Sequence, residues 1–466
     1  MIASTRALLD ALDPVRESER KHRIDATIPG PFTTVGDRIV DAFGRDLILR
    51  GVQHHALQDV DYKGREVRQS DYALMKQLGF TTLRLAISWS RLEPAPGRYD
   101  ERYLREIKDA LDHAQQASLF CVLEWHQDLY GRCTQEEDAP TRMNANGAPD
   151  WAGWDDIEPS VLAHIEAFDR FFANRDGRFD QYLRAWSVVA DRFRDHPAVI
   201  GYDVLNEPQG TPGFETRVLY PAYRRTIAAL KDAGARGLFF LDAPALRNET
   251  NAMATESMRD AGPGVVYAPH LYSGWLSLYV ANVMPRRRTK AMDFAAANKE
   301  AQVMGVPWWN GEWAVNTMLD EWQHYVKAHV ELEDHHRVGS CYWSITRAVP
   351  GQGDASISGG QALFDESYTL KRELVDILSR PYAIATPGIL RWMYYDFGWR
   401  RLSLEIDVKN TEAPLILYAP ARHLGVMREL EVQGSDYAFD FHPEQELVLV
   451  RFKERGMARV RLRSAT

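Results

Sequence analysis

Two acidic residues, each within a short polar motif, are the best candidates for chemistry in this sequence. Glu207 stands in Asn-Glu-Pro and Glu312 stands in Gly-Glu-Trp. One carboxyl group that protonates a leaving oxygen and a second that attacks the anomeric carbon from the opposite face can break a glycosidic bond. Cleavage with retention needs the two groups about 5–5.5 Å apart. We therefore interpret Glu207 as a general acid/base and Glu312 as a nucleophile.

The two carboxyl groups need opposite protonation states before the covalent step. Glu207 must hold a proton near neutral pH, whereas Glu312 must be ionised, a state that neighbouring hydrogen-bond donors favour. Arg84, His270 and Tyr272 are the donors that the sequence offers. Each of these residues alone is more often structural, and Asn-Glu-Pro also occurs in ordinary turns. The catalytic interpretation rests on their joint occurrence at predicted strand ends.

Both motifs end predicted strands of a repeating pattern. Between residues 38 and 380, short β-rich apolar segments alternate with longer segments of helical periodicity, which is typical of βα units around a parallel sheet. Helices are predicted over 66–79, 102–118 and 181–199. Eight strands are predicted at 46–54, 81–89, 119–125, 199–207, 237–243, 265–272, 307–313 and 339–345. Eight strands with intervening helices favour a closed (β/α)8 TIM barrel, an α/β fold.

Active-site groups of such a barrel lie at the C-terminal ends of its strands. Six of the predicted strands end in or carry polar or aromatic residues there. They are Arg84, the segment 124–128, Asn206 with Glu207, His270 with Tyr272, Glu312 and Trp343. A barrel strand that is buried on both faces needs none of these side chains for packing.

The pattern changes after residue 380. Strand-like segments at 400–408, 413–419, 428–434, 446–454 and 457–463 are separated by turn residues, and several alternate apolar and polar side chains. We predict a barrel domain over 1–380 and a small C-terminal antiparallel β-sandwich over 381–466. A sandwich that buttresses the barrel is favoured over a sugar-binding module, because no cluster of exposed aromatic residues is evident in 381–466.

Composition excludes several classes of partner. The chain has 466 residues and a formal net charge of -9, so nucleic acid is not an expected partner. Three Cys make no disulfide framework, and no Cys/His spacing indicates a metal site. The N-terminal sequence lacks the pattern of a secretory signal, and no stretch of about 18 apolar residues is present. We expect a cytoplasmic protein.

The motifs around these residues resemble those of glycoside hydrolase family 5, and in particular its endoglycoceramidase-like subgroup. Matching barrel segments are 83–100, 124–131, 201–208, 268–272, 311–313 and 340–344. Segment 146–156 resembles a loop of the subgroup, and 380–388 and 411–420 resemble its junction and C-terminal β-sandwich. The resemblance implies that Glu207 is the acid/base and Glu312 the nucleophile, and that no cofactor or metal is needed. It implies a binding role for Arg84, His126, Asp128, Asn206, His270, Tyr272 and Trp343.

The resemblance implies a β-glycoside substrate, and its subgroup motifs favour a glycolipid of glycosylceramide or steryl-glucoside type. A β-glucosidase or endoglucanase that acts on soluble glucans or aryl glycosides remains an alternative, as does a sugar-binding protein without activity. The sequence departs from the subgroup at 51–58, where bulky Gln53, His54 and His55 favour removal of a single sugar. Segment 275–284, followed by three Arg, is interpreted as a buried helix, with transient membrane-surface contact as the alternative.

Overall fold

Eight parallel strands form the centre of the computed structural model, which describes residues 24–58, 67–135, 146–160, 162–211, 213–272, 286–347 and 360–465. The strand order is β10-β11-β4-β5-β6-β7-β8-β9. Parallel bridges pair Tyr267 with Trp308 and His270 with Glu312, so β9 and β10 close the sheet into a barrel. The bounds are β4 Arg50–His54, β5 Thr82–Ile87, β6 Phe120–Trp125, β7 Val199–Asp203, β8 Leu238–Asp242, β9 Val265–Ala268, β10 Asn310–Trp313 and β11 Ser340–Tyr342.

The prediction of a (β/α)8 barrel is confirmed, and each predicted strand contains one of these eight. One segment differs. Residues 46–54 form two strands, β3 (Asp46–Leu47) and β4, because Asp46 and Leu47 pair with a strand of the C-terminal region while Arg50–His54 pair within the barrel. No turn between them was expected, because one continuous strand was predicted over 46–54.

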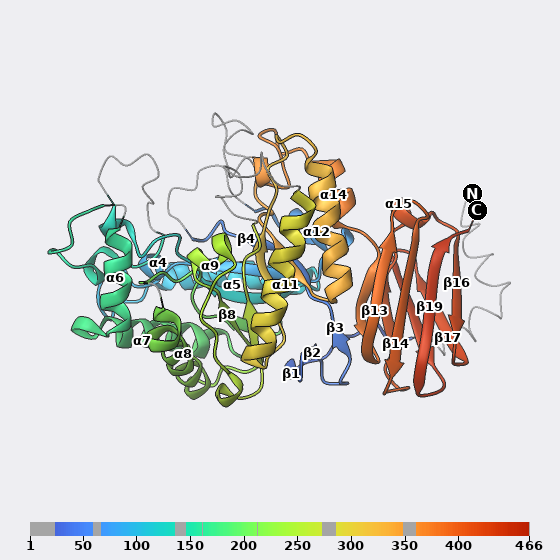
Figure 1. The fold of residues 1–466 in the computed structure, drawn as a ribbon, viewed down its shortest axis with the longest axis horizontal. Coiled ribbons are helices and arrows are strands. Elements are labelled where there is room, and N and C mark those ends of the chain that lie inside the picture. The colour runs from blue at the N-terminus through green and yellow to red at the C-terminus, as the bar shows by residue number, and fades with distance from the viewer. Residues whose placement is uncertain are drawn as a thin grey trace, which may run out of the picture.

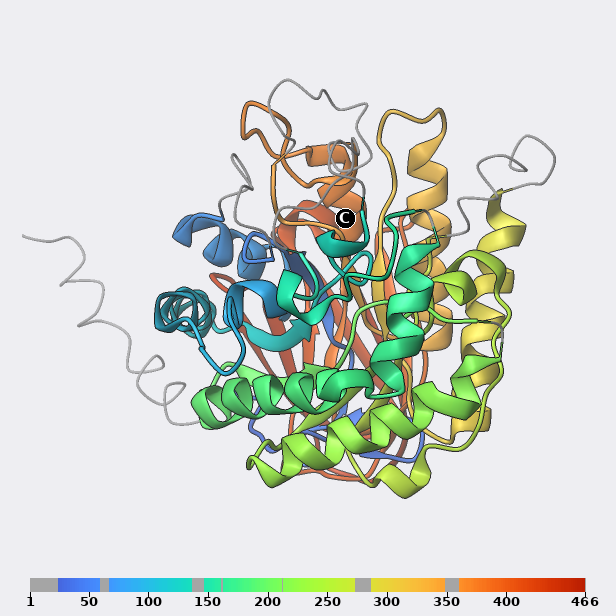
Figure 2. The same ribbon diagram turned by 90° about the vertical axis from the view of Figure 1, so that its left-hand side faces the viewer.

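Helices cover the outside of the barrel, as Figure 2 shows in a view along the strands. Asp100 caps α5 by accepting hydrogen bonds from the N–H groups of Arg102 and Tyr103, and the helix buries Leu104 and Ile107 against the sheet. The helices are α3 Gln69–Gln77, α4 Trp89–Leu92, α5 Glu101–Gln116, α6 Ala163–Phe172, α7 Arg178–Phe193, α8 Tyr220–Asp232, α9 Ala245–Thr250, α11 Arg286–Met304, α12 Trp322–His336, α14 Arg372–Leu378 and α15 Ala421–Leu424. Within the described residues, none of them is long and apolar enough to cross a bilayer.

Two antiparallel sheets form the C-terminal region (Figure 1). One has the order β13-β14-β19-β16, and the other has the order β1-β2-β3-β12-β15-β18-β17. Every second residue of β14 is buried, which is the alternation expected of a half-buried strand. The strands are β1 Thr33–Val35, β2 Arg38–Val40, β12 Tyr382–Thr386, β13 Gly388–Asp396, β14 Arg401–Val408, β15 Leu415–Tyr418, β16 Arg428–Gln433, β17 Tyr437–His442, β18 Leu447–Phe452 and β19 Gly456–Ser464.

The N-terminal strands β1–β3 belong to the second sheet, a feature that the sequence did not reveal. β3 pairs antiparallel with β12, so chain from before the barrel is built into the C-terminal region. Pairing across such a sequence separation leaves no local pattern. In Figure 1, β1–β3 lie between the barrel and the sheets that follow it.

One apolar core joins the interior of the barrel to these sheets. Val122, Phe240 and Trp309 of the barrel belong to the same buried cluster as Leu390 and Ile416. A buried ion-pair network reinforces the junction. Asp334 binds Arg50 at 2.6 Å and Arg380 at 2.7 Å, and its second oxygen accepts a hydrogen bond from the N–H of Tyr395 at 3.2 Å.

Deletion of residues 381–466 is expected to cause aggregation rather than a loss of substrate affinity alone. The deletion exposes the apolar side chains that the barrel and sheets share, and it leaves the edge of β3 unpaired. Expression followed by size-exclusion chromatography measures the outcome. A soluble barrel fragment with full activity would contradict the buttress interpretation.

Candidate active site

The predicted site residues gather at the C-terminal ends of the barrel strands. Alternation along each strand explains how they come together, because residues two apart point to the same face. Val122 and Phe240 fill the barrel interior, and the inward positions two residues further on are Glu124 and Asp242. An apolar layer therefore supports a polar layer, which contains Arg84, Glu124, Asp203, Asn206, Asp242, His270 and Glu312, all buried.

The two candidate catalytic carboxylates face each other across one histidine. The Nδ1 atom of His270 lies 2.7 Å from Oε1 of Glu207 and 3.9 Å from Oε1 of Glu312. These contacts limit the separation of the two oxygens to roughly 6.6 Å, at the bottom of the range of about 6.5–9.5 Å in inverting enzymes. The geometry therefore favours direct attack by one carboxylate over activation of a water molecule between them.

Glu312 is held by donors on both oxygens. The Tyr272 hydroxyl donates to Oε1 at 2.7 Å, and Nη1 of Arg84 donates to Oε2 at 3.1 Å. Burial nevertheless raises the pKa of Glu312 above its ordinary value, against the lowering effect of His270 and Arg84, and Glu207 raises it further. The donors favour the ionised form of Glu312, as expected, but desolvation has the larger effect on the pKa of this carboxyl group.

Among the described residues, Glu207 is held through a single oxygen. His270 Nδ1 and Asn248 Nδ2, at 2.7 and 2.9 Å, both contact Oε1. Oε2 thus remains for a leaving-group oxygen, and the side chain is 23% exposed. The backbone of Glu207 has a φ of 37°, and its N–H donates to Asp242 at 3.2 Å. A positive φ is uncommon for a residue other than glycine, and such strain tends to occur at functional sites.

The surroundings of His270 favour the positively charged form of its ring. Burial lowers the pKa of its ring, but the carboxylates of Asp242, Glu312 and Glu207 outweigh that effect and raise the pKa well above the ordinary value. Nε2 lies 3.1 Å from Oδ2 of Asp242, so the two ring nitrogens contact two carboxylates. A charged His270 favours a negative charge on Glu312 and donates to Glu207 at the same time.

Arg84 organises the floor of the site. Its Nε donates to Asp203 at 2.7 Å, and its Nη2 donates to Asn206 and to Asp242, each at 3.0 Å. Glu124 lies 3.6 Å away. Burial alone would lower the pKa of Arg84, but the four surrounding carboxylates raise it well above the ordinary value. Arg84 thus neutralises a buried cluster of carboxylates that includes the proposed nucleophile.

Sequence reasoning missed three members of this site: Asp203, Asp242 and Asn248. Asp203 and Asp242 end β7 and β8, but the predicted strands ran on to Glu207 and Ala243, so neither aspartate stood at a predicted strand end. Asn248 lies on α9, after β8, and nothing in its sequence context marks it. Besides contacting Glu207, its Oδ1 accepts the N–H of His270 at 3.2 Å.

Trp343 forms an aromatic wall beside the carboxylates. Its ring stacks on His55 at 4.3 Å and lies 5.7 Å from His126. His126 is held by Glu124 at 2.9 Å, and the exposed Asp128 lies 3.5 Å from its other ring nitrogen. The structure therefore places the predicted binding residues His126, Asp128 and Trp343 on one side of the site.

Of the three bulky residues at the end of β4, only His55 contacts this wall. Gln53 donates to Glu124 at 2.9 Å and accepts from Arg84 at 3.2 Å, so it belongs to the buried network. His54 contacts the Tyr72 hydroxyl at 2.8 Å, away from Trp343. Segment 275–284, for which membrane contact was considered, lies outside the described residues. In the described part of the chain, no group of three or more His, Cys, Asp or Glu could hold a metal ion.

Sequence relatives of this chain are endoglycoceramidases. Endoglycoceramidase I of Rhodococcus hoagii is 28% identical over 197 residues, which are 38% of this chain and 37% of the relative. The endoglycoceramidase of Cyanea nozakii is 24% identical over 248 residues, which are 45% of this chain and 46% of the relative. The matched segments thus span less than half the length of these curated relatives.

Solved structures match over nearly the whole chain. Endo-glycoceramidase II from Rhodococcus sp., in a complex with ganglioside GM3, has a TM-score of 0.78 and 26% identity, with 93% of this chain and 100% of that chain covered. An endogalactoceramidase has a TM-score of 0.75 and 27% identity, with 92% and 99% covered. The family model of cellulases, glycosyl hydrolase family 5, matches residues 40–349. The chain therefore belongs to glycosyl hydrolase family 5.

Proposed function

We propose that this protein is a retaining β-glycosidase that hydrolyses glycolipids of the glycosylceramide or steryl-glucoside type by double displacement. Glu312 attacks the anomeric carbon while Glu207 protonates the leaving oxygen, and Glu207 then activates the water that releases the sugar. The observation that carries the proposal is the contact of both carboxylates with one nitrogen of His270, at 2.7 and 3.9 Å.

Three neighbours prepare the site for charge transfer. Arg84, His270 and Tyr272 surround Glu312 with donors, which stabilise the carboxylate as the leaving group when the covalent intermediate breaks down. Burial raises the pKa of the Tyr272 hydroxyl, and Glu312 raises it further, so Tyr272 remains a neutral donor at neutral pH. Asn206 adjoins Glu207 and accepts a hydrogen bond from Arg84 at 3.0 Å, which supports a role for its side chain in bonding a sugar hydroxyl.

The relatives support the glycolipid part of the proposal. Endoglycoceramidase and glucosylceramidase both occur among them, the latter from Rhizopus delemar at 24% identity over 253 residues. The stacking of His55 on Trp343 supports a short binding region for the sugar part of the substrate, with room for one glucose or galactose. Action on soluble glucans or aryl glycosides is the second candidate, because the family model is that of cellulases.

Parallel assays on glucosylceramide, a steryl glucoside, cellobiose and carboxymethylcellulose test the substrate class. We expect the highest kcat/KM with one of the two glycolipids, and proton NMR should show that the released sugar first appears as the β anomer. Preference for cellobiose or the polymer would overturn the lipid assignment. First appearance of the α anomer would overturn the double displacement.

The activity is expected to fall toward acid at a higher pH than an ordinary glutamate would dictate. Glu312 must be ionised to attack, and burial raises its pKa above 4.5. The rate should therefore decline as the pH falls through this raised value. A profile of kcat/KM against pH reports the pKa of Glu312 in the free enzyme. An acidic limb centred at or below about 4.5, the ordinary glutamate value, would contradict the expected effect of burial.

A further inference from the structure

A cavity lies at the end of the barrel opposite the catalytic carboxylates. Its volume of about 670 Å³ is within the range of small-molecule sites, about 300–1,000 Å³. The walls come from β1–β3, from the residues that precede β10 and β11, from α11 and α12, and from β13. No residue of the candidate active site lines it. The cavity thus occurs where the barrel, the N-terminal strands and the C-terminal sheets meet.

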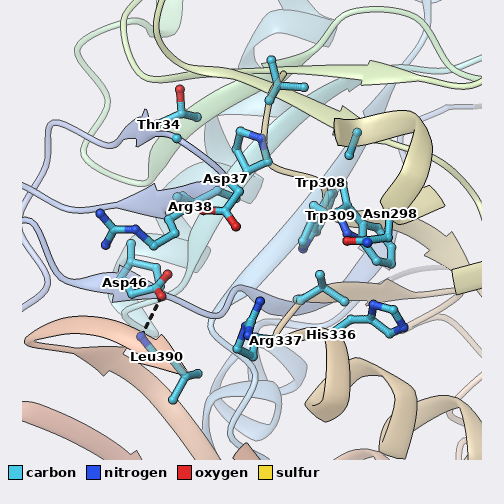
Figure 3. A pocket seen from close by; sticks show the side chains of 18 of the residues that line it. Thr34, Asp37, Arg38, Asp46, Asn298, Trp308, Trp309, His336, Arg337 and Leu390 are labelled. Atoms are coloured by element: carbon cyan, nitrogen blue, oxygen red, sulfur yellow. Dashed lines mark hydrogen bonds between the residues drawn. The ribbon is translucent and has the colours of Figure 1, made fainter. Parts of the chain in front are cut away.

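The cavity has an apolar part and a cationic part. Leu47, Leu49, Trp308, Trp309 and Leu390 are buried side chains that line it. Figure 3 shows Arg38 and Asp46 on one side and Trp308, Trp309 and Asn298 on the other, with Arg337 and His336 below the space between them. A ligand there would contact hydrophobic and charged groups at once.

Three guanidinium groups of the lining form no direct ion pair with a carboxylate among the described residues, although Arg38 and Arg337 lie close enough to Asp46 to exert a lowering effect on its pKa. Arg38, Arg259 and Arg337 donate to the carbonyl oxygens of Gly388, Gly305 and Arg391, at 3.5, 3.4 and 2.9 Å. Elsewhere on the described surface, arginines are commonly paired; the lining residue Arg391 binds Asp407 at 2.9 Å. The three charges are therefore available to an anion.

The acidic residues of the lining do not cancel this charge. Asp46 is buried, and its Oδ2 accepts the N–H of Leu390 at 3.2 Å. Burial raises its pKa to about 7, against the lowering effects of Arg38, the Leu390 N–H and Arg337. Near neutral pH, Asp46 is thus partly protonated. Asp37 is exposed and offsets at most one of the three guanidinium groups.

We propose that this cavity binds a small organic anion, a carboxylate on an aliphatic chain, with the carboxylate at Arg38 and Arg337 and the chain against Leu47, Leu390 and Trp308. Guanidinium groups bind carboxylates through paired, charge-assisted hydrogen bonds, and the apolar wall removes the chain from water. The site is separate from the glycosidase centre, so it does not depend on the proposed function.

Isothermal titration calorimetry with octanoate, 1-octanol and octylammonium tests the proposal, because the three probes share one chain and differ in charge. Octanoate is expected to bind at one site, at least tenfold tighter than octanol, and octylammonium should not compete with it. Equal affinity for octanoate and octanol would overturn the cationic recognition. Absence of saturable octanoate binding would overturn the site itself.

Variants locate the binding. Arg38→Gln with Arg337→Gln is expected to weaken octanoate binding by at least tenfold, and the corresponding double lysine variant, which keeps both charges but loses the paired hydrogen bonds, should bind between the double glutamine variant and the wild type. Arg102→Gln, at a side chain that is 83% exposed on α5, is the matched control and should change nothing. Octanoate binding that survives the double glutamine variant unchanged would overturn the proposal, and the lysine variant guards against an effect of misfolding.

Discussion

Glu312→Gln is expected to reduce hydrolysis of every β-glycoside by roughly 10⁴-fold or more, because an amide cannot form the covalent intermediate. The loss should not depend on the leaving group, since attack by Glu312 precedes every other step. Glutamine keeps the size of the side chain and can still contact Tyr272. The folded structure should therefore survive, and thermal unfolding of the variant measures this.

Glu207→Gln should behave differently, and the contrast separates the two roles. A poor leaving group, such as the alcohol of a lipid glycoside, needs the proton of Glu207, so its cleavage should fall by about 10²–10⁴-fold. A dinitrophenyl glycoside leaves without a proton, so its first step should remain fast and the covalent intermediate should accumulate as a burst. Azide, which attacks without the help of a base, should then accelerate turnover of the Glu207 variant.

Azide should have no such effect on the Glu312 variant, which forms no intermediate. The product of the azide reaction is expected to be a β-glycosyl azide, because the second displacement inverts the first. If the Glu312 variant instead gave a β-glycosyl azide, the two assignments would have to be exchanged, whereas an α-glycosyl azide would mean that azide had replaced the missing carboxylate in a single displacement. If neither variant lost activity, the chemistry would lie elsewhere in the molecule.

The barrel and the two glutamates were predictable from the sequence because each has a local signature. A strand that is buried on both faces is a short run of mostly apolar residues. A charged residue near the end of such a run stands out, as Glu312 does. Asp203 and Asp242 end strands that the prediction extended to Glu207 and Ala243, so the sequence did not mark them as strand-end residues. These two residues hold Arg84, which in turn contacts Glu312.

Other features had no local signature. The pairing of β3 with β12 joins residues more than 300 positions apart. The contact of Asn248 with Glu207 depends on how α9 is placed after β8. The roles of Gln53 and His54 were mistaken for the same reason. Adjacent residues point to different surroundings, and only the folded chain shows that Gln53 joins the Arg84 network while His55 reaches Trp343.

Arg84→Met is expected to lower the free energy of unfolding by about 3–5 kcal/mol, the usual cost of leaving a buried charge without its partner. Methionine approximately fills the space of the arginine stem, so a cavity contributes little. Without Arg84, the side chains of Asp203, Asp242, Glu124 and Glu312 share one buried region with no guanidinium between them. Urea denaturation of wild type and variant measures the difference. Arg102→Met is the matched control, because that side chain is 83% exposed and should cost little.

The loss in free energy of unfolding caused by Arg84→Met should become smaller as the pH falls. This direction of change distinguishes loss of charge from loss of packing. Arg84 lowers the pKa of Asp203, Asp242 and Glu312. Its removal raises those values in the folded state only, so the folded variant takes up protons that the unfolded chain does not yet bind. Stability then rises toward acid relative to wild type. A smaller deficit at about pH 5 than at about pH 8 is the expected result, because protonation relieves the mutual repulsion of the carboxylates. A deficit that stayed constant between these conditions would mean that Arg84 stabilises the barrel through packing, and the electrostatic account of the floor of the site would fail.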